Sequence, residues 1–237
     1  MDCTNFLPVT TPLPAPYDFD DYNHLTITPQ MYGNDSNPDC VTAARAHHTI
    51  RLVWARSRSS VTVTEPEVVN QYTRENIQEN GSFIPGQGLD LNTSLDEWVS
   101  SGWPYGGAAD NDTYMHKIAC HSQPYAIDGA QLDTQGAIAA LSPQQLQVGI
   151  CANSGAQLNL MLPSNFLPTD HRTFGQGHVW SSTDEGTQQH VVLLTGYGPE
   201  SPPVFTGISW GTKQSITWEF LKAHCFGVFF VQAADST

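Results

Sequence analysis

The sequence changes character at Cys40, and this change limits the folds that the chain can adopt. Residues 33–39 form a run of Gly, Asn, Asp, Ser and Pro, in which the proline disfavours a helix at the residue before it. From Cys40 to about Trp54 the apolar residues recur with helical spacing. The pattern predicts a loop followed by a helix, with Asp39 as the N-cap and Cys40 in the first turn.

A cysteine at that position has two interpretations. The first turn of a helix presents unpaired backbone N–H groups and the positive end of the helix dipole, and both favour a thiolate. A loop that delivers Cys40 to a helix N-terminus therefore fits a nucleophile. The alternative is an unreactive cysteine that packs as a small apolar side chain.

Composition argues against several classes of partner. The 237 residues suffice for one large domain or two joined lobes. The formal charge of −14 argues against nucleic acid and anionic membranes as partners. There is no long apolar run and no basic, apolar N-terminal signal, so we expect a cytoplasmic protein that is not secreted by a Sec signal. Five scattered cysteines without a CxxC pair predict reduced thiols.

Three regions are predicted along the chain. Residues 1–30 are rich in proline and carry several aromatic residues, which predicts an extended arm that lies on the body or on a neighbouring subunit. Residues 31–130 read as a helical lobe that carries Cys40. Residues 131–237 read as an antiparallel β-sheet lobe that carries His190, so the fold class is α+β.

The expected elements follow from capping and periodicity. Thr64 starts a second helix that runs to residue 77 or 78, and Asn92 or Thr93 caps a third that stops at Gly102. In the second half we expect strands over 147–152, 190–197, 204–210 and 226–232, helices over 133–141 and 217–224, and a long polar loop over 153–189.

Four short motifs occur in a recognisable order. They are Tyr32-Gly33-Asn34-Asp35 with Asp39-Cys40, His190 at the head of an apolar strand that ends in Gly-Tyr-Gly, Ser209-Trp210-Gly211, and Thr217-Trp218-Glu219-Phe220. Over residues 30–232 the chain resembles the papain-like cysteine peptidases, most closely a poorly characterised branch from bacteria and their phages. The resemblance implies a helical lobe, a sheet lobe and a cleft between them.

The resemblance also implies roles for individual residues. Cys40 would be the nucleophile, and His190 would act as its base and later as an acid. Asn34 stands where the family has a glutamine that helps to hold the oxyanion. Trp210 would shield His190, and the substrate cleft would be lined by Gly86, Gln87, Gly88 and Trp210.

Two departures from the family pattern bear on activity. Ile208 stands where the family has an asparagine that orients the imidazole, and its side chain accepts no hydrogen bond. Asp133 and Asp184 are candidate substitutes, although the sequence places neither near His190. Asp39 adjoins the thiol, and its charge opposes thiolate formation, so we expect a thiol less acidic than in papain.

Two functions are compatible with this pattern. The first is a papain-like thiol hydrolase, a peptidase or amidase acting on a peptide or amide substrate through a Cys–His dyad. The alternative is a catalytically silent structural protein, for example a component of a phage virion that contacts other subunits through residues 1–30. Whether the chain is an enzyme stays open because of Ile208.

No metal or cofactor site is expected. His116, Cys120 and His121 have a spacing that metal ligands can use, but no second Cys/His pair stands nearby. The Gly86–Gly88 stretch is too short for a phosphate-binding loop.

Overall fold

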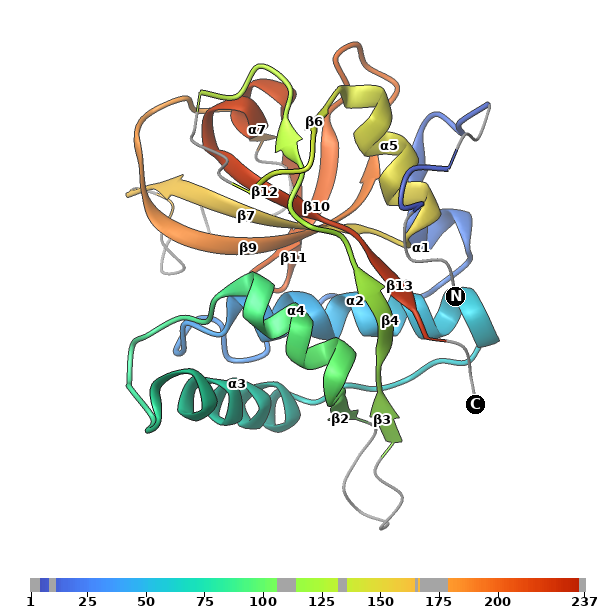
Figure 1. The fold of residues 1–237 in the computed structure, drawn as a ribbon. Coiled ribbons are helices and arrows are strands. Elements are labelled where there is room, and N and C mark those ends of the chain that lie inside the picture. The colour runs from blue at the N-terminus through green and yellow to red at the C-terminus, as the bar shows by residue number, and fades with distance from the viewer. Residues whose placement is uncertain are drawn as a thin grey trace.

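The computed structural model describes residues 5–8, 12–105, 114–131, 136–164, 166 and 179–234. The helices between residues 40 and 100 gather in one lobe, and a mostly antiparallel sheet with further helices beside it forms the other, as the lower and upper halves of Figure 1 show. This arrangement confirms the predicted α+β fold class.

Helix α2, Cys40–Ser57, lies between the two lobes and is the central element of the fold. Every residue from Val41 to Leu52 is buried, because β9 of the sheet packs against α2 on one side and α3 on another. The helix begins at the predicted residue and ends at Arg58, which adopts a left-handed conformation.

Two further helices complete the helical lobe. Helix α3, Glu65–Asn80, starts after the predicted cap Thr64, which forms a capping box with Glu67. It runs to Asn80, two to three residues beyond the predicted end at 77 or 78, and Gly81 is its C-cap. Helix α4, Leu91–Ser100, starts earlier than expected. Its N-cap is Asp90, whose Oδ1 accepts from the Thr93 N–H at 2.8 Å, so the prediction of Asn92 or Thr93 as the cap was wrong.

A buried ion pair joins the three helices. Arg45 Nη1 of α2 lies 2.6 Å from Glu75 Oε1 of α3, and the guanidinium also hydrogen-bonds the hydroxyl of Ser94 in α4. The same guanidinium lies over the ring of Trp98, 5.4 Å from its centroid. Because this cation is satisfied from both neighbouring helices, it fixes their positions around α2.

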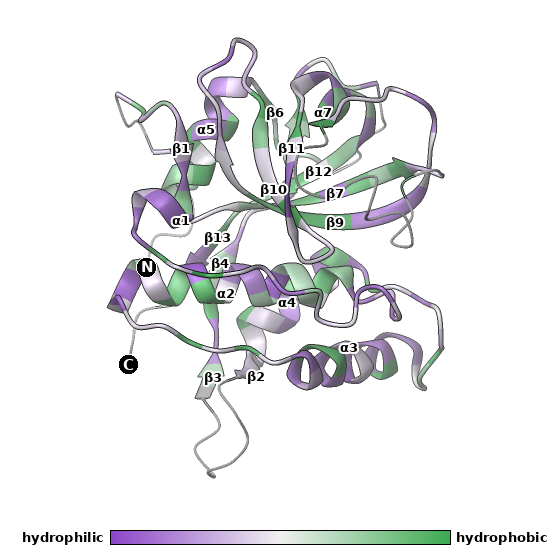
Figure 2. Ribbon diagram, turned by 180° about the vertical axis from the view of Figure 1, so that it is seen from behind, coloured by the Kyte–Doolittle hydropathy of each residue, from purple (hydrophilic) through white to green (hydrophobic). Residues whose placement is uncertain are grey.

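The main sheet has seven strands in the described residues, in the order β12-β7-β9-β10-β11-β8, with β1 added beside β9. Its strands are β1 Tyr17–Asp18, β7 Ala156–Pro163, β8 Val179–Trp180, β9 Gly186–Tyr197, β10 Phe205–Ser209, β11 Thr212–Ile216 and β12 Cys225–Phe229. Figure 2 shows apolar residues along the inner parts of these strands, where the core lies.

Helix α5, Pro143–Ala152, corrects the prediction for the start of the sheet lobe. The stretch 147–152 was expected to be a strand, but it is the second half of this helix, which a capping box at Ser142 and Gln145 begins. The expected helix over 133–141 is also wrong, since its last two residues form strand β6, Ala140–Leu141, and residues 132–135 lie outside the described part.

The long polar loop expected over 153–189 contains a central strand instead. Strand β7 lies between β12 and β9, and its residues Leu158, Leu160 and Leu162 are fully buried. The short helix before β12 agrees with its prediction: α7 spans Trp218–His224, and Thr217 caps it.

The described part of the N-terminal arm packs on its own chain. After strand β1 pairs with the end of β9, helix α1, Phe19–Tyr22, presents Asp20 to the buried Arg51 of α2 at 2.6 Å. Lys213 lies 3.0 Å from the same carboxylate. The predicted contact with a neighbouring subunit stays a prediction.

Three pairs of short strands lie outside the main sheet in the described residues. They form the pairs β2 Trp103–Tyr105 with β3 Tyr114–His116, β4 Ile118–His121 with β13 Val231–Ala233, and β5 Ala126–Ile127 with β6. Strand β13 lies beside the helical lobe. The predicted boundary between the two lobes at residue 130 stays a prediction. Cys120 of β4 is disulfide-bonded, which corrects the expectation that all thiols are reduced. No helix in the described ranges is long and apolar enough to cross a membrane.

Candidate active site

A cavity of about 760 Å³ opens between the two lobes. Its walls come from the loop before α2, the end of α3, the loop before α4, and strands β7 and β9. All seven residues that the sequence placed in a site line this cavity: Asn34, Cys40, Gly86, Gln87, Gly88, His190 and Trp210.

Cys40 is the first residue of α2 and is half-buried at the cavity wall. Burial raises the pKa of its thiol to about 11. A hydrogen bond from the backbone of Val191 acts in the opposite direction, and the carboxylate of Asp39 adds to the rise. Val191 directly follows His190, so the sulfur lies beside the backbone that carries the imidazole.

The sequence suggested that His190 is the first residue of its strand. In the structure it lies inside strand β9. The strand starts at Gly186, and its exposed part gives way to its buried part at His190. The ring stacks on Trp210, with centroids 4.5 Å apart and planes 24° apart. Burial lowers the pKa of the imidazole to about 3, which favours the neutral ring.

The two ring nitrogens of His190 have different surroundings. Nε2 lies 2.7 Å from the hydroxyl oxygen of Ser209. Nδ1 has no hydrogen-bond partner among the described residues, yet it does not belong to the buried polar atoms that lack one, so it retains contact with solvent. Ser209 therefore holds the ring through Nε2, while Nδ1 remains accessible.

Ser209 supplies the partner that Ile208 does not, and the sequence pattern missed it. The pairing of β10 with β9 shifts register between Thr206 and Gly207. Because side chains alternate along a strand, this bulge exchanges the faces of Ile208 and Ser209 and turns the serine to the face of His190. Ile208 is buried. Ser209, which was not considered from the sequence as an orienting group, is therefore the side chain that hydrogen-bonds the imidazole.

The two aspartates considered as substitutes do not change this result. Asp184 accepts a hydrogen bond from Ser182 Oγ at 2.9 Å, and no bond joins it to His190. Asp133 lies outside the described residues.

The side chains of Asp39 and Asn34, in the loop before Cys40, hydrogen-bond to each other. Asp39 occupies the N-cap position of α2, but its side chain does not cap the helix. Its Oδ1 accepts from Asn34 Nδ2 at 2.9 Å, and burial raises the pKa of this carboxyl to about 7. The second Asn34 amide contact, to the Asn37 carbonyl, is long at 3.5 Å.

The stretch Gly86–Gly88 forms the cavity edge opposite the sheet. The carbonyl of Gln87 accepts from the Tyr72 hydroxyl at 2.7 Å and from Asn76 Nδ2 at 3.1 Å. Gly86 adopts a left-handed conformation with φ of +79°, which favours glycine at this turn. These contacts hold the main chain of this stretch in place at the cavity wall.

The three residues whose spacing could suit a metal, His116, Cys120 and His121, make other contacts. His116 accepts from Trp98 Nε1, His121 lies 2.9 Å from Asp96, and Cys120 is in a disulfide. Within the described ranges no group of three or more His, Cys, Asp or Glu side chains could hold a metal ion.

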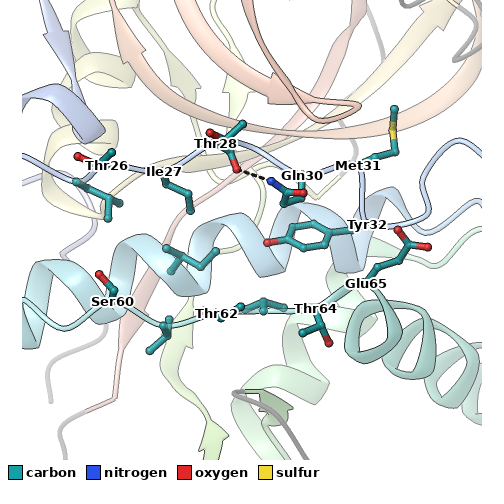
Figure 3. Close-up of a pocket in the computed structure, with 14 residues that line it drawn as sticks. Thr26, Ile27, Thr28, Gln30, Met31, Tyr32, Ser60, Thr62, Thr64 and Glu65 are labelled. Atoms are coloured by element: carbon teal, nitrogen blue, oxygen red, sulfur yellow. Dashed lines mark hydrogen bonds between the residues drawn. The ribbon is translucent and has the colours of Figure 1, made fainter.

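A second cavity, of about 540 Å³, lies on another face of α2. It runs between residues 25–32 and 60–65, as Figure 3 shows, and neither Cys nor His lines it. Thiol chemistry is therefore available in the cavity between the lobes and not in this one.

Comparison with known proteins agrees at the level of fold. Neither a family model nor a curated protein sequence matches the chain. Solved structures do match. A structure from a study of the mite allergens Blo t 1 and Der p 1 has a TM-score of 0.65 and 15% identity over 95% of this chain and 73% of its own.

Two proteases illustrate the breadth of the likeness. The cysteine protease CMS1MS2 of Carica candamarcensis has a TM-score of 0.63 at 13% identity, covering 93% of this chain and 99% of its own. Xylellain of Xylella fastidiosa has a TM-score of 0.61 at 11% identity, covering 94% and 87%. The predicted placement in a bacterial and phage branch stays a prediction. In its two lobes and the cavity between them, this chain has the fold of the papain-like cysteine proteases.

Proposed function

We propose that this chain is a thiol hydrolase, a peptidase or amidase, with Cys40 as nucleophile and His190 as its base. The observation that carries the proposal is that both side chains line one cavity, the thiol on a helix N-terminus and the imidazole held by Ser209. The fold is shared with cysteine proteases.

The proposed reaction uses the thiol of Cys40 and the Nδ1 atom of His190. His190 Nδ1 takes the proton of the Cys40 thiol while the sulfur attacks the carbonyl carbon of the substrate. The imidazolium then gives that proton to the leaving amine, which leaves an acyl-enzyme thioester. Water, deprotonated by the same imidazole, attacks the thioester and releases the acid, and the proton returns to the thiolate.

Ser209 acts as the orienting group in this proposal. Its hydroxyl accepts from Nε2–H, which leaves the lone pair on Nδ1 facing the cavity. Asn34 acts as the oxyanion donor: its amide hydrogen on the long contact to Asn37 is weakly held and is free to turn to the substrate.

Thiol labelling followed by mass spectrometry tests the proposal. We expect iodoacetamide to modify Cys40 faster than the half-buried Cys151, and His190→Ala to remove that difference. E-64, the ligand named with the Carica protease, should slow labelling at Cys40. The variant Cys151→Ala is the matched control and should retain peptide hydrolysis, which Cys40→Ala should abolish. Equal labelling of Cys40 and Cys151, without hydrolysis, would favour the structural-protein alternative.

A further inference from the structure

The cavity that holds Cys40 and His190 is lined by carboxylates. Asp35, Glu79 and Asp90 belong to its wall, and no lysine or arginine of the described residues does. A cleft with one sign of charge concentrates ligands of the opposite sign.

The basic side chains of this acidic chain are used elsewhere. Ion pairs join Arg45 to Glu75, Arg51 to Asp20, Arg74 to Glu97, Lys213 to Asp18 and Lys222 to Glu219. Across the described ranges no such pair reaches the three cavity carboxylates. The fold thus neutralises many of its carboxylates and leaves these without a counter-ion.

Glu79, near the end of α3, has an incomplete set of contacts. Its Oε1 is closed off from water and lacks any hydrogen-bond partner. The backbone of Asp90 hydrogen-bonds the same carboxylate, and both burial and the charge of Asp90 raise its pKa. Asp90 itself has one oxygen committed to Thr93 at the start of α4. Two neighbouring carboxylates therefore share a wall where a donor is missing.

We propose that this cavity selects substrates that carry a lysine or arginine side chain, seated against Glu79 and Asp90. This rests on the proposed hydrolase function. A cationic side chain supplies the positive charge that no described basic residue brings to this wall, and it offsets the repulsion between the two carboxylates.

Cleavage of matched fluorogenic peptides tests the proposal. A peptide set carries Arg, Gln or Glu at one scanned position, and kcat/KM is measured for each. We expect a preference of about tenfold for Arg over Gln at the best position, weakened by added salt. The double variant Glu79→Gln/Asp90→Asn should abolish that preference, and asparagine keeps the cap of α4.

A charge-matched control separates this seat from the net charge of the chain. Asp128→Asn/Glu200→Gln also removes two carboxylates, both exposed and outside the cavity wall, and should keep the preference and the basal rate. Equal rates for the Arg and Gln peptides would overturn the charge selection while the hydrolase proposal stands.

If no peptide is cleaved, the hydrolase proposal fails and binding decides the charge inference separately. Calorimetry on Cys40→Ala then compares the Arg and Gln peptides. Tighter binding of the Arg peptide that is lost in the Glu79/Asp90 double variant supports the seat, and equal binding overturns it.

Discussion

At the scale of single residues, burial sets the pKa values of the two groups that we propose as nucleophile and base. It raises the pKa of the Cys40 thiol and lowers that of the His190 imidazole, so both are neutral at rest. The helix N-terminus beneath Cys40 is therefore insufficient to create a thiolate. In the proposed reaction the proton therefore moves from sulfur to Nδ1 as the sulfur attacks, and not before the substrate binds.

The Ser209 hydroxyl should control the orientation of the imidazole. Ser209→Ala removes the only hydrogen bond that the described residues make to the His190 ring. We expect kcat to fall by about 10- to 100-fold, less than the ~10⁴ seen for the orienting group of a serine triad, with KM little changed. The pH dependence of kcat/KM should shift with it.

A conservative variant and a remote one complete that experiment. Ser209→Thr keeps the hydroxyl and should restore most of the rate, whereas Ser215→Ala removes an exposed serine of the next strand and should change nothing. An unchanged pH profile in Ser209→Ala would show that the contact is only structural.

At neutral pH, Asp39 should lower the free energy of unfolding. Its pKa is raised from 3.8 to about 7, so between these values the unfolded chain has lost a proton that the folded chain keeps. The contribution of Asp39 to stability therefore falls as pH rises through this window, opposite in sign to that of the buried histidines, and Asp39→Asn should gain about 2 to 4 kcal/mol above it. Asparagine can still accept from Asn34.

Urea denaturation at pH values inside and outside the window measures this gain. The curves of the two proteins should converge below about pH 4, where both states hold the proton. A constant difference at all pH values would show that Asp39 stays ionised in the folded protein.

At the scale of elements, the N-terminal arm is fastened to α2 by a buried charge. Asp20→Ala leaves the guanidinium of Arg51 buried without its carboxylate partner, and we expect a loss of about 3 to 5 kcal/mol in the free energy of unfolding. The neighbouring Asp21 is exposed, so Asp21→Ala is the matched control with little effect. A small loss in both would show that the arm is not part of the folding unit.

Element boundaries were predictable where a cap marks them. The starts of α3 and α7 follow from Thr64 and Thr217, whereas α2 begins after Asp39 although the side chain of Asp39 makes no capping hydrogen bond. The stretch 147–152 was misread because a short apolar run fits a strand or a buried helix equally well. Leu146, Gly149 and Ile150 recur with helical spacing and pack inward, which settles the choice.

At the scale of the whole molecule, buried histidines link the fold to pH. His47 and His48 of α2 donate to the carbonyls of Gln30 and Asn153, and burial lowers their pKa values to about 3 and about 4. As pH falls below 6.5, the unfolded chain gains protons that the folded chain refuses, so stability should decline toward about pH 4.

Thermal denaturation across that range measures the decline. His24 is exposed, and His24→Gln should leave the pH dependence as it is, whereas His48→Gln should weaken it without removing it, because the other buried histidines remain. A melting temperature that is independent of pH over this range would contradict the prediction.

By itself, the sequence determined the α+β class and the local signals for Cys40 at a helix start and His190 in an apolar strand. Capping and periodicity depend on neighbours in the chain, so they can be read along it. Tertiary structure decided what depends on residues far apart: the meeting of α2 and β9 at one cavity, and the bulge that turns Ser209 to His190. Burial decided the protonation of the reactive pair, because desolvation arises only when the lobes close around it.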